Sequence, residues 1–135
     1  MAIFLDTGFY LGLVHSKDAH HEQSKSILNK VKAGIFGRLY TFNYVMVETA
    51  TLAGSRSGND ERVINNTQRY FIGDLILAVS IRPTGNDDEK TWDLFRKVNS
   101  GNKEKIISFV VCSNLILCKR YQIDQIVSYD GHFEG

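Results

Sequence analysis

Short apolar runs alternate with longer amphipathic segments along the chain, and this pattern predicts an α/β domain. Strands are predicted at residues 2–5, 39–42, 75–81 and 125–129, and a further short apolar run lies at 106–109. The first run, AIFL, is apolar throughout, which is typical of a strand buried on both faces in a parallel sheet. The run LILAVSI at residues 75–81 is the clearest strand of the set.

Helical periodicity fills the segments between these runs. Helices are predicted at residues 7–14, 20–32, 44–53, 61–71, 87–98 and 111–121. The start of the helix at residues 61–71 follows from Asn59-Asp60-Glu61, which is typical of a capped helix start. Trp92, Phe95 and Val98 share the inward face of the helix at residues 87–98. The alternation predicts one domain, residues 1–135, in three layers: a mostly parallel central sheet of four to five strands with helices on both faces.

Composition narrows the protein class. A chain of 135 residues is long enough for one domain with its own core. No apolar run approaches the roughly 20 residues of a membrane helix, and the start MAIFLDTGFY lacks the basic region of a signal peptide. We therefore expect a soluble cytoplasmic protein. Its net charge of +1, from 16 basic and 15 acidic residues, neither indicates nor excludes a nucleic-acid partner.

Two cysteines and three histidines carry less information. Cys112 and Cys118 lie on roughly opposite faces of a predicted helix, so we interpret both as small apolar residues. His15, His20 and His21 are closely spaced, a pattern that invites a metal-site interpretation. We interpret these histidines as exposed instead.

Two acidic residues follow apolar runs. Asp6 comes directly after the first predicted strand, and Asp130 after the last. The carboxyl ends of parallel strands gather functional groups at one edge of the sheet. Converging carboxylates repel one another unless they share a proton or a cation, and Mg²⁺ favours such oxygen ligands. Taken singly, Asp6 is equally explained as a helix cap and Asp130 as a turn residue.

Glu48 is a third candidate because it lies in an otherwise uncharged stretch, residues 40–54. By itself it is also explained as the solvated side of its helix. Three or four carboxylates from separate segments are what metal-assisted phosphodiester cleavage requires, since the metal activates a water and stabilises the developing charge.

The order of three segments, FLDTGFYLGLV, YVMVETATL and VSYDGHFEG, resembles the PIN (PilT N-terminal) domain family from end to end. Three motifs carry the resemblance: Asp6 and Thr7 match the first, Glu48 the second, and Ser128, Asp130 and Phe133 the third. The resemblance implies a Mg²⁺- or Mn²⁺-dependent endoribonuclease, notably a VapC-type toxin, with RNA as substrate. It also implies a homodimer and a small antitoxin protein that blocks the site. Many relatives add a short strand after the last motif, so we expect either a missing edge strand or a truncated chain.

The chain departs from the family at one position. The family carries a third acidic residue where this chain has Val111, which offers no ligand atom. Three explanations stay open: a degenerate domain with weak or no activity, an active site that works with Asp6, Glu48 and Asp130 alone, or a substitution or sequence error. Asn114 lies three residues later on nearly the same helical face and offers an amide oxygen to a metal or its water. The alternative is an Asn on the helix surface.

Asp87 and Asp88 are not expected to replace the missing acid, because they precede a helix and suit its N-terminal dipole. In the enzyme hypothesis, Asp6, Glu48 and Asp130 hold the metal, while Thr7 and Ser128 orient carboxylates or the water. A second hypothesis is a catalytically silent PIN-like module that binds RNA or protein. A third, in which Asp6 accepts a phosphoryl group in a receiver-like or phosphatase fold, is weakened by the lack of a second Asp two residues later.

Overall fold

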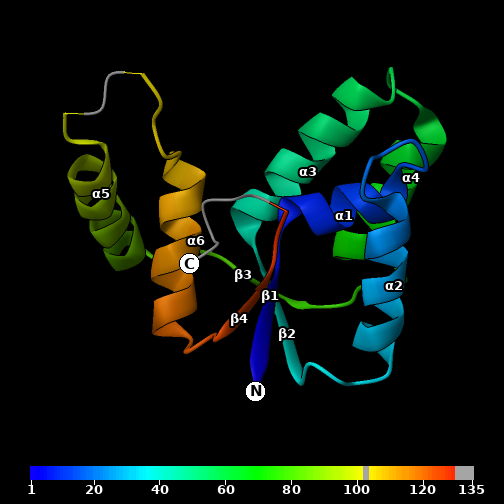
Figure 1. The fold of residues 1–135 in the computed structure, drawn as a ribbon, viewed down its shortest axis with the longest axis horizontal. Helices are drawn as coiled ribbons and strands as arrows, with labels where there is room; N and C mark the ends of the chain where they lie inside the picture. The colour runs from blue at the N-terminus through cyan, green and yellow to red at the C-terminus, as the bar shows by residue number, and fades with distance from the viewer. Residues whose placement is uncertain (102–103, 130–135) are drawn as a thin grey trace.

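A computed structural model describes residues 1–101 and 104–129 (Figure 1). Its described strands form one parallel sheet in the order β3-β2-β1-β4: β1 (Ala2–Leu5), β2 (Arg38–Phe42), β3 (Val79–Ile81) and β4 (Gln125–Val127). Leu5 is paired with Val127, and Phe4 with Tyr40. The first strand is therefore central and touches the last strand of the described chain, so its carboxyl end lies beside that of β4.

Helices cover the sheet on both sides, which confirms the predicted three-layer α/β architecture (Figure 1). One group consists of α1 (Thr7–Val14), α2 (His21–Lys32), α3 (Asn43–Arg56) and α4 (Glu61–Ile72). The other consists of α5 (Gly85–Asn99) and α6 (Phe109–Arg120). The predicted helices therefore all form, with ends shifted by a few residues.

Aromatic packing fixes the centre of the molecule. The rings of Phe4 in β1 and Phe42 in β2 stack with centroids 4.4 Å apart. Tyr10 of α1 packs against Phe71 of α4, also at 4.4 Å. Leu117 of α6 is fully buried in the same core. Each such side chain contributes about 1.5–3 kcal/mol through burial, so the junction between β1 and α1 is held firmly from both sides.

The helix starts are built as the sequence indicates. Asp60 caps α4, as predicted, by accepting a hydrogen bond from the Arg62 N–H. Thr84 and Asp87 form a capping box at the start of α5, so the predicted helix-end role of Asp87 is confirmed. Asp87 is also buried and paired with Arg120 of α6. Burial would raise the pKa of this carboxyl, but hydrogen bonds from Thr84 and the Arg120 charge together hold the pKa below its ordinary value.

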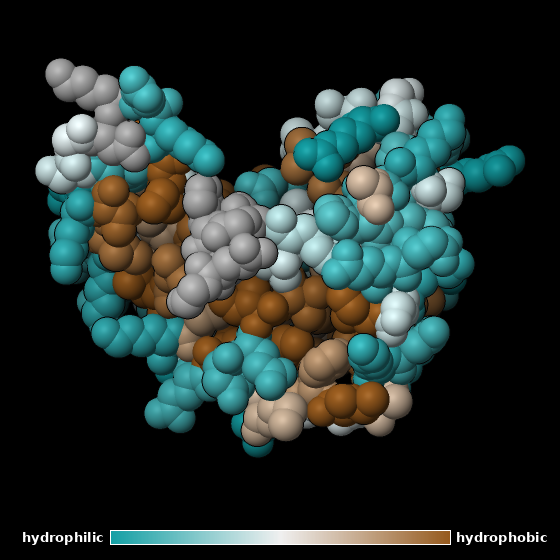
Figure 2. Space-filling view, viewed as in Figure 1, coloured by the Kyte–Doolittle hydropathy of each residue, from teal (hydrophilic) through white to brown (hydrophobic). Residues whose placement is uncertain are grey.

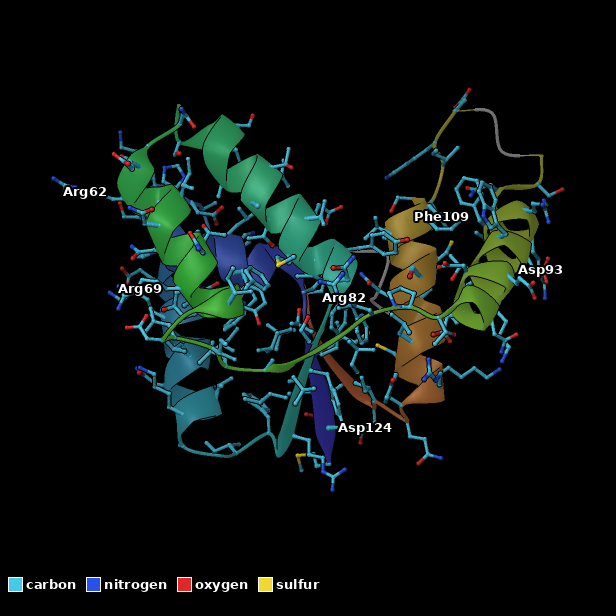
Figure 3. The ribbon with its side chains drawn as sticks, turned by 180° about the vertical axis from the view of Figure 1, so that it is seen from behind. Arg62, Arg69, Arg82, Asp93, Phe109 and Asp124 are labelled. Atoms are coloured by element: carbon cyan, nitrogen blue, oxygen red, sulfur yellow. The ribbon has the colours of Figure 1, made fainter. Side chains whose placement is uncertain are left out.

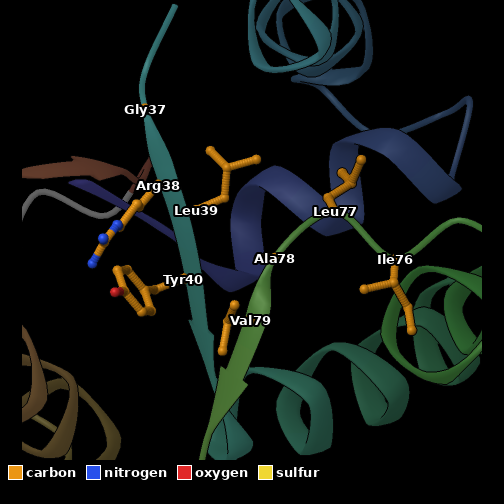
Figure 4. Close-up of a pocket in the computed structure, with 8 residues that line it drawn as sticks. All are labelled: Gly37, Arg38, Leu39, Tyr40, Ile76, Leu77, Ala78 and Val79. Carbon is orange, nitrogen blue, oxygen red and sulfur yellow. The ribbon is translucent and has the colours of Figure 1, made fainter. Parts of the chain in front are cut away.

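The strand predicted at residues 75–81 is too long. Only Val79–Ile81 pairs with β2, beginning at the partners Tyr40 and Val79. Residues 75–78 diverge from β2, and the Leu75 N–H donates to the Arg69 carbonyl instead. Leu39 and Leu77 still pack against the core from the two separating segments (Figure 4). Partial core packing by Leu77 and Ala78 accounts for some of the apolar run, while Ile76 is exposed, so apolarity alone does not distinguish this coil from a strand.

Two details of the second helical group also differ from expectation. Trp92 does not face inward: it is 50% exposed and packs at the surface against Phe95 and Phe109. The apolar run at 106–109 forms no strand, because the Ile107 backbone is bonded to the Asn99 side chain and Ser108 caps α6. Figure 2 shows hydrophobic side chains on the surface of this α5–α6 lobe.

Both cysteines are buried and free, which agrees with their interpretation as small apolar residues. Among the described residues, no helix has the length and apolar content to span a membrane.

Candidate active site

Asp6 occupies the junction between the end of β1 and the start of α1. Its N–H donates to the carbonyl of Val127 at 3.1 Å, which continues the β1–β4 pairing by one residue. Its side chain caps α1 by accepting the Thr7 N–H at Oδ1, 2.8 Å away. Oδ2 accepts the hydroxyl of Ser128, just after β4, at 3.1 Å. The carboxylate is therefore held at the edge of the sheet. The same side chain caps α1 and lies beside the end of β4.

Glu48 reaches the same place from α3, the helix that follows β2. Its Oε1 accepts the hydroxyl of Thr7 at 2.7 Å. Thr7 therefore holds both acids, one through its backbone N–H and the other through its side chain. The structure thus brings together Asp6, Thr7, Glu48 and Ser128, four of the residues that the sequence selected.

These four residues line a hollow of about 290 Å³, which we call the acidic hollow. Its remaining lining residues are Gly8, Leu11, Asp18, His20, Leu52, Arg56 and Tyr129. The sequence did not single out Arg56 or His20 for this site. Arg56 had a usable signal, because Glu48, Leu52 and Arg56 recur every four residues on one face of α3.

Other arginines lie elsewhere. Figure 3 shows Arg62 and Arg69 on the outer side of α4, pointing away from the molecule. Arg69 is paired with Asp74 through two hydrogen bonds. Both are exposed at the surface. Arg56 is exposed as well, but unlike Arg62 and Arg69 it lines the acidic hollow.

The interpretation of the histidines as exposed is wrong, because His15, His20 and His21 are all half-buried. The His21 Nδ1 donates to the carbonyl of Gly12 at 2.6 Å. The His20 ring stacks on Tyr129 with centroids 4.1 Å apart. These contacts come from α1 and from the residues after β4, so spacing along the chain gave no sign of them.

Val111, which stands where the family carries an acid, and Asn114 both lie in α6. Val111 is buried, its N–H donates to the capping hydroxyl of Ser108, and it does not line the acidic hollow. Asn114 is only 1% exposed, so the expectation of a surface Asn is wrong. Its Oδ1 has no hydrogen-bond partner among the described residues. Asp130 lies outside the described residues.

The charge of Asp6 reaches α6. Burial raises the pKa of the Cys118 thiol to about 12, and the nearby Asp6 carboxylate adds to the effect. Cys118 lies one helical turn after Asn114, on the same face. Asn114 therefore shares a face of α6 with Cys118, the residue whose pKa the Asp6 charge affects.

The donor set fits a hydrated hard cation. Mg²⁺ is commonly held by one or two carboxylates, several waters and substrate phosphates. Asp6 supplies a carboxylate from the end of β1 and Glu48 supplies one from α3, the helix after the neighbouring strand β2. Glu48 uses only Oε1 in hydrogen bonds to described residues. Within residues 1–101 and 104–129, no group of three His, Cys, Asp or Glu side chains is arranged for a metal.

A central parallel sheet with helices on both faces, and carboxylates from the end of β1 and from α3 that meet in one hollow, is the arrangement expected of a PIN-like α/β domain. No family model matches the chain. A VapC ribonuclease of Archaeoglobus fulgidus is 25% identical over 133 residues, which cover 98% of this chain and 80% of that protein. The crystal structure of Mycobacterium tuberculosis VapC20, described as a sarcin-ricin loop cleaving toxin, is similar with a TM-score of 0.76 and 24% identity. That match covers 97% of this chain and 92% of the other. The resemblance to the PIN-domain family, and to its VapC-type members, is confirmed.

Proposed function

We propose that this protein is a Mg²⁺- or Mn²⁺-dependent endoribonuclease of the PIN type, the toxin of a toxin–antitoxin pair acting in the cytoplasm. One observation carries the proposal: Thr7 ties the carboxylates of Asp6 and Glu48 together in a hollow that Arg56 also lines. The similarity to a VapC ribonuclease over nearly the whole chain supports the same activity.

In this proposal Asp6, Glu48 and Asp130 hold the metal. The bound metal supplies a nucleophilic water and stabilises the charge that develops at the phosphate. Thr7 and Ser128 keep the carboxylates in one orientation, since each hydroxyl donates to a carboxylate oxygen. Such supporting hydrogen bonds commonly affect metal affinity or activity by about 10–100-fold.

Arg56 has a separate role in the proposal. Its guanidinium enters from α3, two helical turns beyond Glu48, and is exposed. A guanidinium suits a phosphate because it offers planar, paired donors. Arg56 therefore binds an RNA phosphate beside the carboxylates and offsets the repulsion between RNA and the acidic residues.

A catalytically silent RNA- or protein-binding module is the second candidate. Val111 favours it, because the buried valine supplies no oxygen ligand where the family carries an acid. Cleavage of a structured RNA with Mn²⁺ separates the two candidates when the unaltered chain, Asp6→Asn and Val111→Asp are compared. We expect cleavage by the unaltered chain and none by Asp6→Asn. Cleavage only after Val111→Asp would instead support the silent module.

Val111→Asp requires a check of folding, because it places a carboxylate at a buried position. Thermal unfolding followed by circular dichroism serves this purpose, with Val111→Asn as the uncharged comparison. If both the unaltered chain and a folded Val111→Asp fail to cleave RNA, the ribonuclease proposal is wrong.

The proposal includes a homodimer and a small antitoxin whose segment blocks the acidic hollow. The α5–α6 lobe supports association with another protein chain, because Trp92, Ile106 and Leu115 expose apolar surface there. Light scattering coupled to size-exclusion chromatography measures the oligomeric state directly. A monomer at micromolar concentration would contradict the dimer without affecting the ribonuclease proposal.

A further inference from the structure

A stacked pair of rings stands at the rim of the acidic hollow. The planes of His20 and Tyr129 are 18° apart, with centroids separated by 4.1 Å. Both residues line the hollow together with Asp6 and Glu48. The proposed cleavage reaction assigns neither ring a task.

Tyr129 is fixed in place by the first two helices. Its ring lies on α1 so closely that a Cβ at Gly8 would come within 2.9 Å of Cδ2. Its hydroxyl shares a 2.8 Å hydrogen bond with Ser24 of α2. Ser24 in turn approaches α1 at Gly12, where a Cβ would clash with its hydroxyl. Tyr129 is therefore a rigid support under the His20 ring.

His20 is also held from its own side. Its backbone N–H donates to the Asp18 carboxylate at 2.8 Å, and its Nδ1 lies 3.3 Å from Oε1 of Gln23. The ring remains only half-buried, because one face meets Tyr129 while the residue also borders the hollow. A flat, preoriented ring at a site rim offers stacking surface at little cost in conformational entropy.

The surroundings favour a nucleotide over other flat ligands. The hollow combines Arg56, suited to a phosphate, with two carboxylates suited to a metal bound to that phosphate. Unpaired RNA bases are typically recognised by stacking on aromatic or histidine rings. Bases inside a duplex have no free face for such a contact.

We propose that His20, supported by Tyr129, is a stacking platform for an unpaired RNA base next to the phosphate held in the acidic hollow. The inference rests on the proposed ribonuclease function and deepens it, since it selects single-stranded or looped RNA over duplex RNA. His20 is therefore a residue of substrate selection.

Binding of RNA without cleavage tests this inference. All proteins carry Asp6→Asn, and the ligand is a short single-stranded RNA with one 2-aminopurine, whose fluorescence falls on stacking. His20→Ala is expected to weaken binding by about 5- to 100-fold, because one base–ring stack is worth about 1–3 kcal/mol. His20→Phe keeps a ring and is expected to bind within about twofold of the parent with the same quenching. His15→Ala, a histidine outside the hollow, is the control and should change nothing.

The results against the inference are specific. It is overturned if His20→Ala binds like the parent, if His20→Phe loses as much affinity as His20→Ala, or if no single-stranded RNA binds at all. Equal affinity for a duplex of the same sequence would also overturn it. Circular dichroism melts verify that the His20 variants fold.

The two proposals fail separately. Cleavage by the unaltered chain together with His20-independent binding removes only the stacking platform. Binding that depends on the His20 ring, without cleavage by any folded variant, removes the ribonuclease and keeps the platform on a silent RNA-binding module.

Discussion

The hydroxyl of Thr7 donates a 2.7 Å hydrogen bond to Oε1 of Glu48, across 41 positions of the chain. Because the N–H of the same residue donates to Asp6, one residue sets the relative position of two carboxylates. In the proposed ribonuclease, the motif after the first strand therefore supplies two positions: the acid itself and the residue that connects it to the acid of α3.

Thr7→Val tests this connection, since valine keeps the shape of threonine and lacks the hydroxyl. We expect Mn²⁺ affinity and RNA cleavage to fall by about 10–100-fold, the usual effect of losing a hydrogen bond that orients a ligand. Isothermal titration with Mn²⁺ and a cleavage assay measure both. Thr51→Val is the matched control, because the Thr51 hydroxyl bonds only the carbonyl of Val47 on the exposed side of α3. Equal effects of the two substitutions would contradict the role of Thr7.

Arg56→Ala is expected to weaken RNA binding and to reduce the slope of log affinity against log salt by roughly one unit, as expected for the loss of one phosphate contact. Binding is measured by fluorescence anisotropy at several salt concentrations. Arg62→Ala removes the same charge from the outer side of α4 and should leave both quantities unchanged (Figure 3). The phosphate role of Arg56 is wrong if the two variants behave alike.

Asp87 predicts a pH-dependent contribution to stability. Its folded pKa lies below the ordinary value, so the contribution is present above the unfolded pKa of about 3.9 and is lost as the pH falls through the folded pKa. Asp87→Asn is therefore expected to lower the free energy of unfolding by about 1–3 kcal/mol at pH 7. The difference should shrink steadily below about pH 4.

Urea unfolding at pH 7 and at pH 3 measures this contribution. Asp93→Asn is the control, because Asp93 forms only an exposed ion pair with Arg96 in the same helix. Exposed pairs contribute about 0–1 kcal/mol. An Asp87→Asn effect that stays the same at both pH values would contradict the ion-pair explanation.

Asn114→Ala tests whether the buried amide supports the metal. We expect Mn²⁺ affinity to fall by several-fold, because the Oδ1 atom is buried in α6 and has no hydrogen-bond partner among the described residues. Ser113→Ala is the matched control, since the hydroxyl at this adjacent position of α6 is also buried and also has no partner in the described part of the chain. Unchanged Mn²⁺ affinity in Asn114→Ala would end the metal role.

Local sequence signals predicted most of the fold. Helix periodicity and the cap at Asp60 depend on neighbours along the chain, so they were predicted without the structure, whereas the cap at Thr84 was not and α5 begins two residues earlier than expected. The end of the first strand, just before Asp6, also followed from the apolar run that precedes it. The run at residues 75–81 misled, because its first half does not pair with β2: Leu77 and Ala78 pack partly against the core, and Ile76 is exposed.

The candidate site was predicted where a known motif marks it and missed where packing creates it. Asp6, Thr7, Glu48 and Ser128 converge as the motif order implies. His20 was misplaced, because its burial depends on Tyr129. For Asn114, the packing of α6 excludes only the surface alternative. Contacts between distant segments leave no periodic signal in a single sequence.

The pairing of β1 with β4 also sets the order in which the site is assembled. Asp6 and Glu48 leave the ribosome early, but Ser128 lies 122 positions after the carboxylate to which it donates. Tyr129, whose ring stacks against His20, follows Ser128. A growing chain therefore holds two carboxylates without the wall that β4 supplies, and the complete hollow forms only after that strand has been made. For a nuclease this means that activity against RNA begins after nearly all of the described chain has been translated.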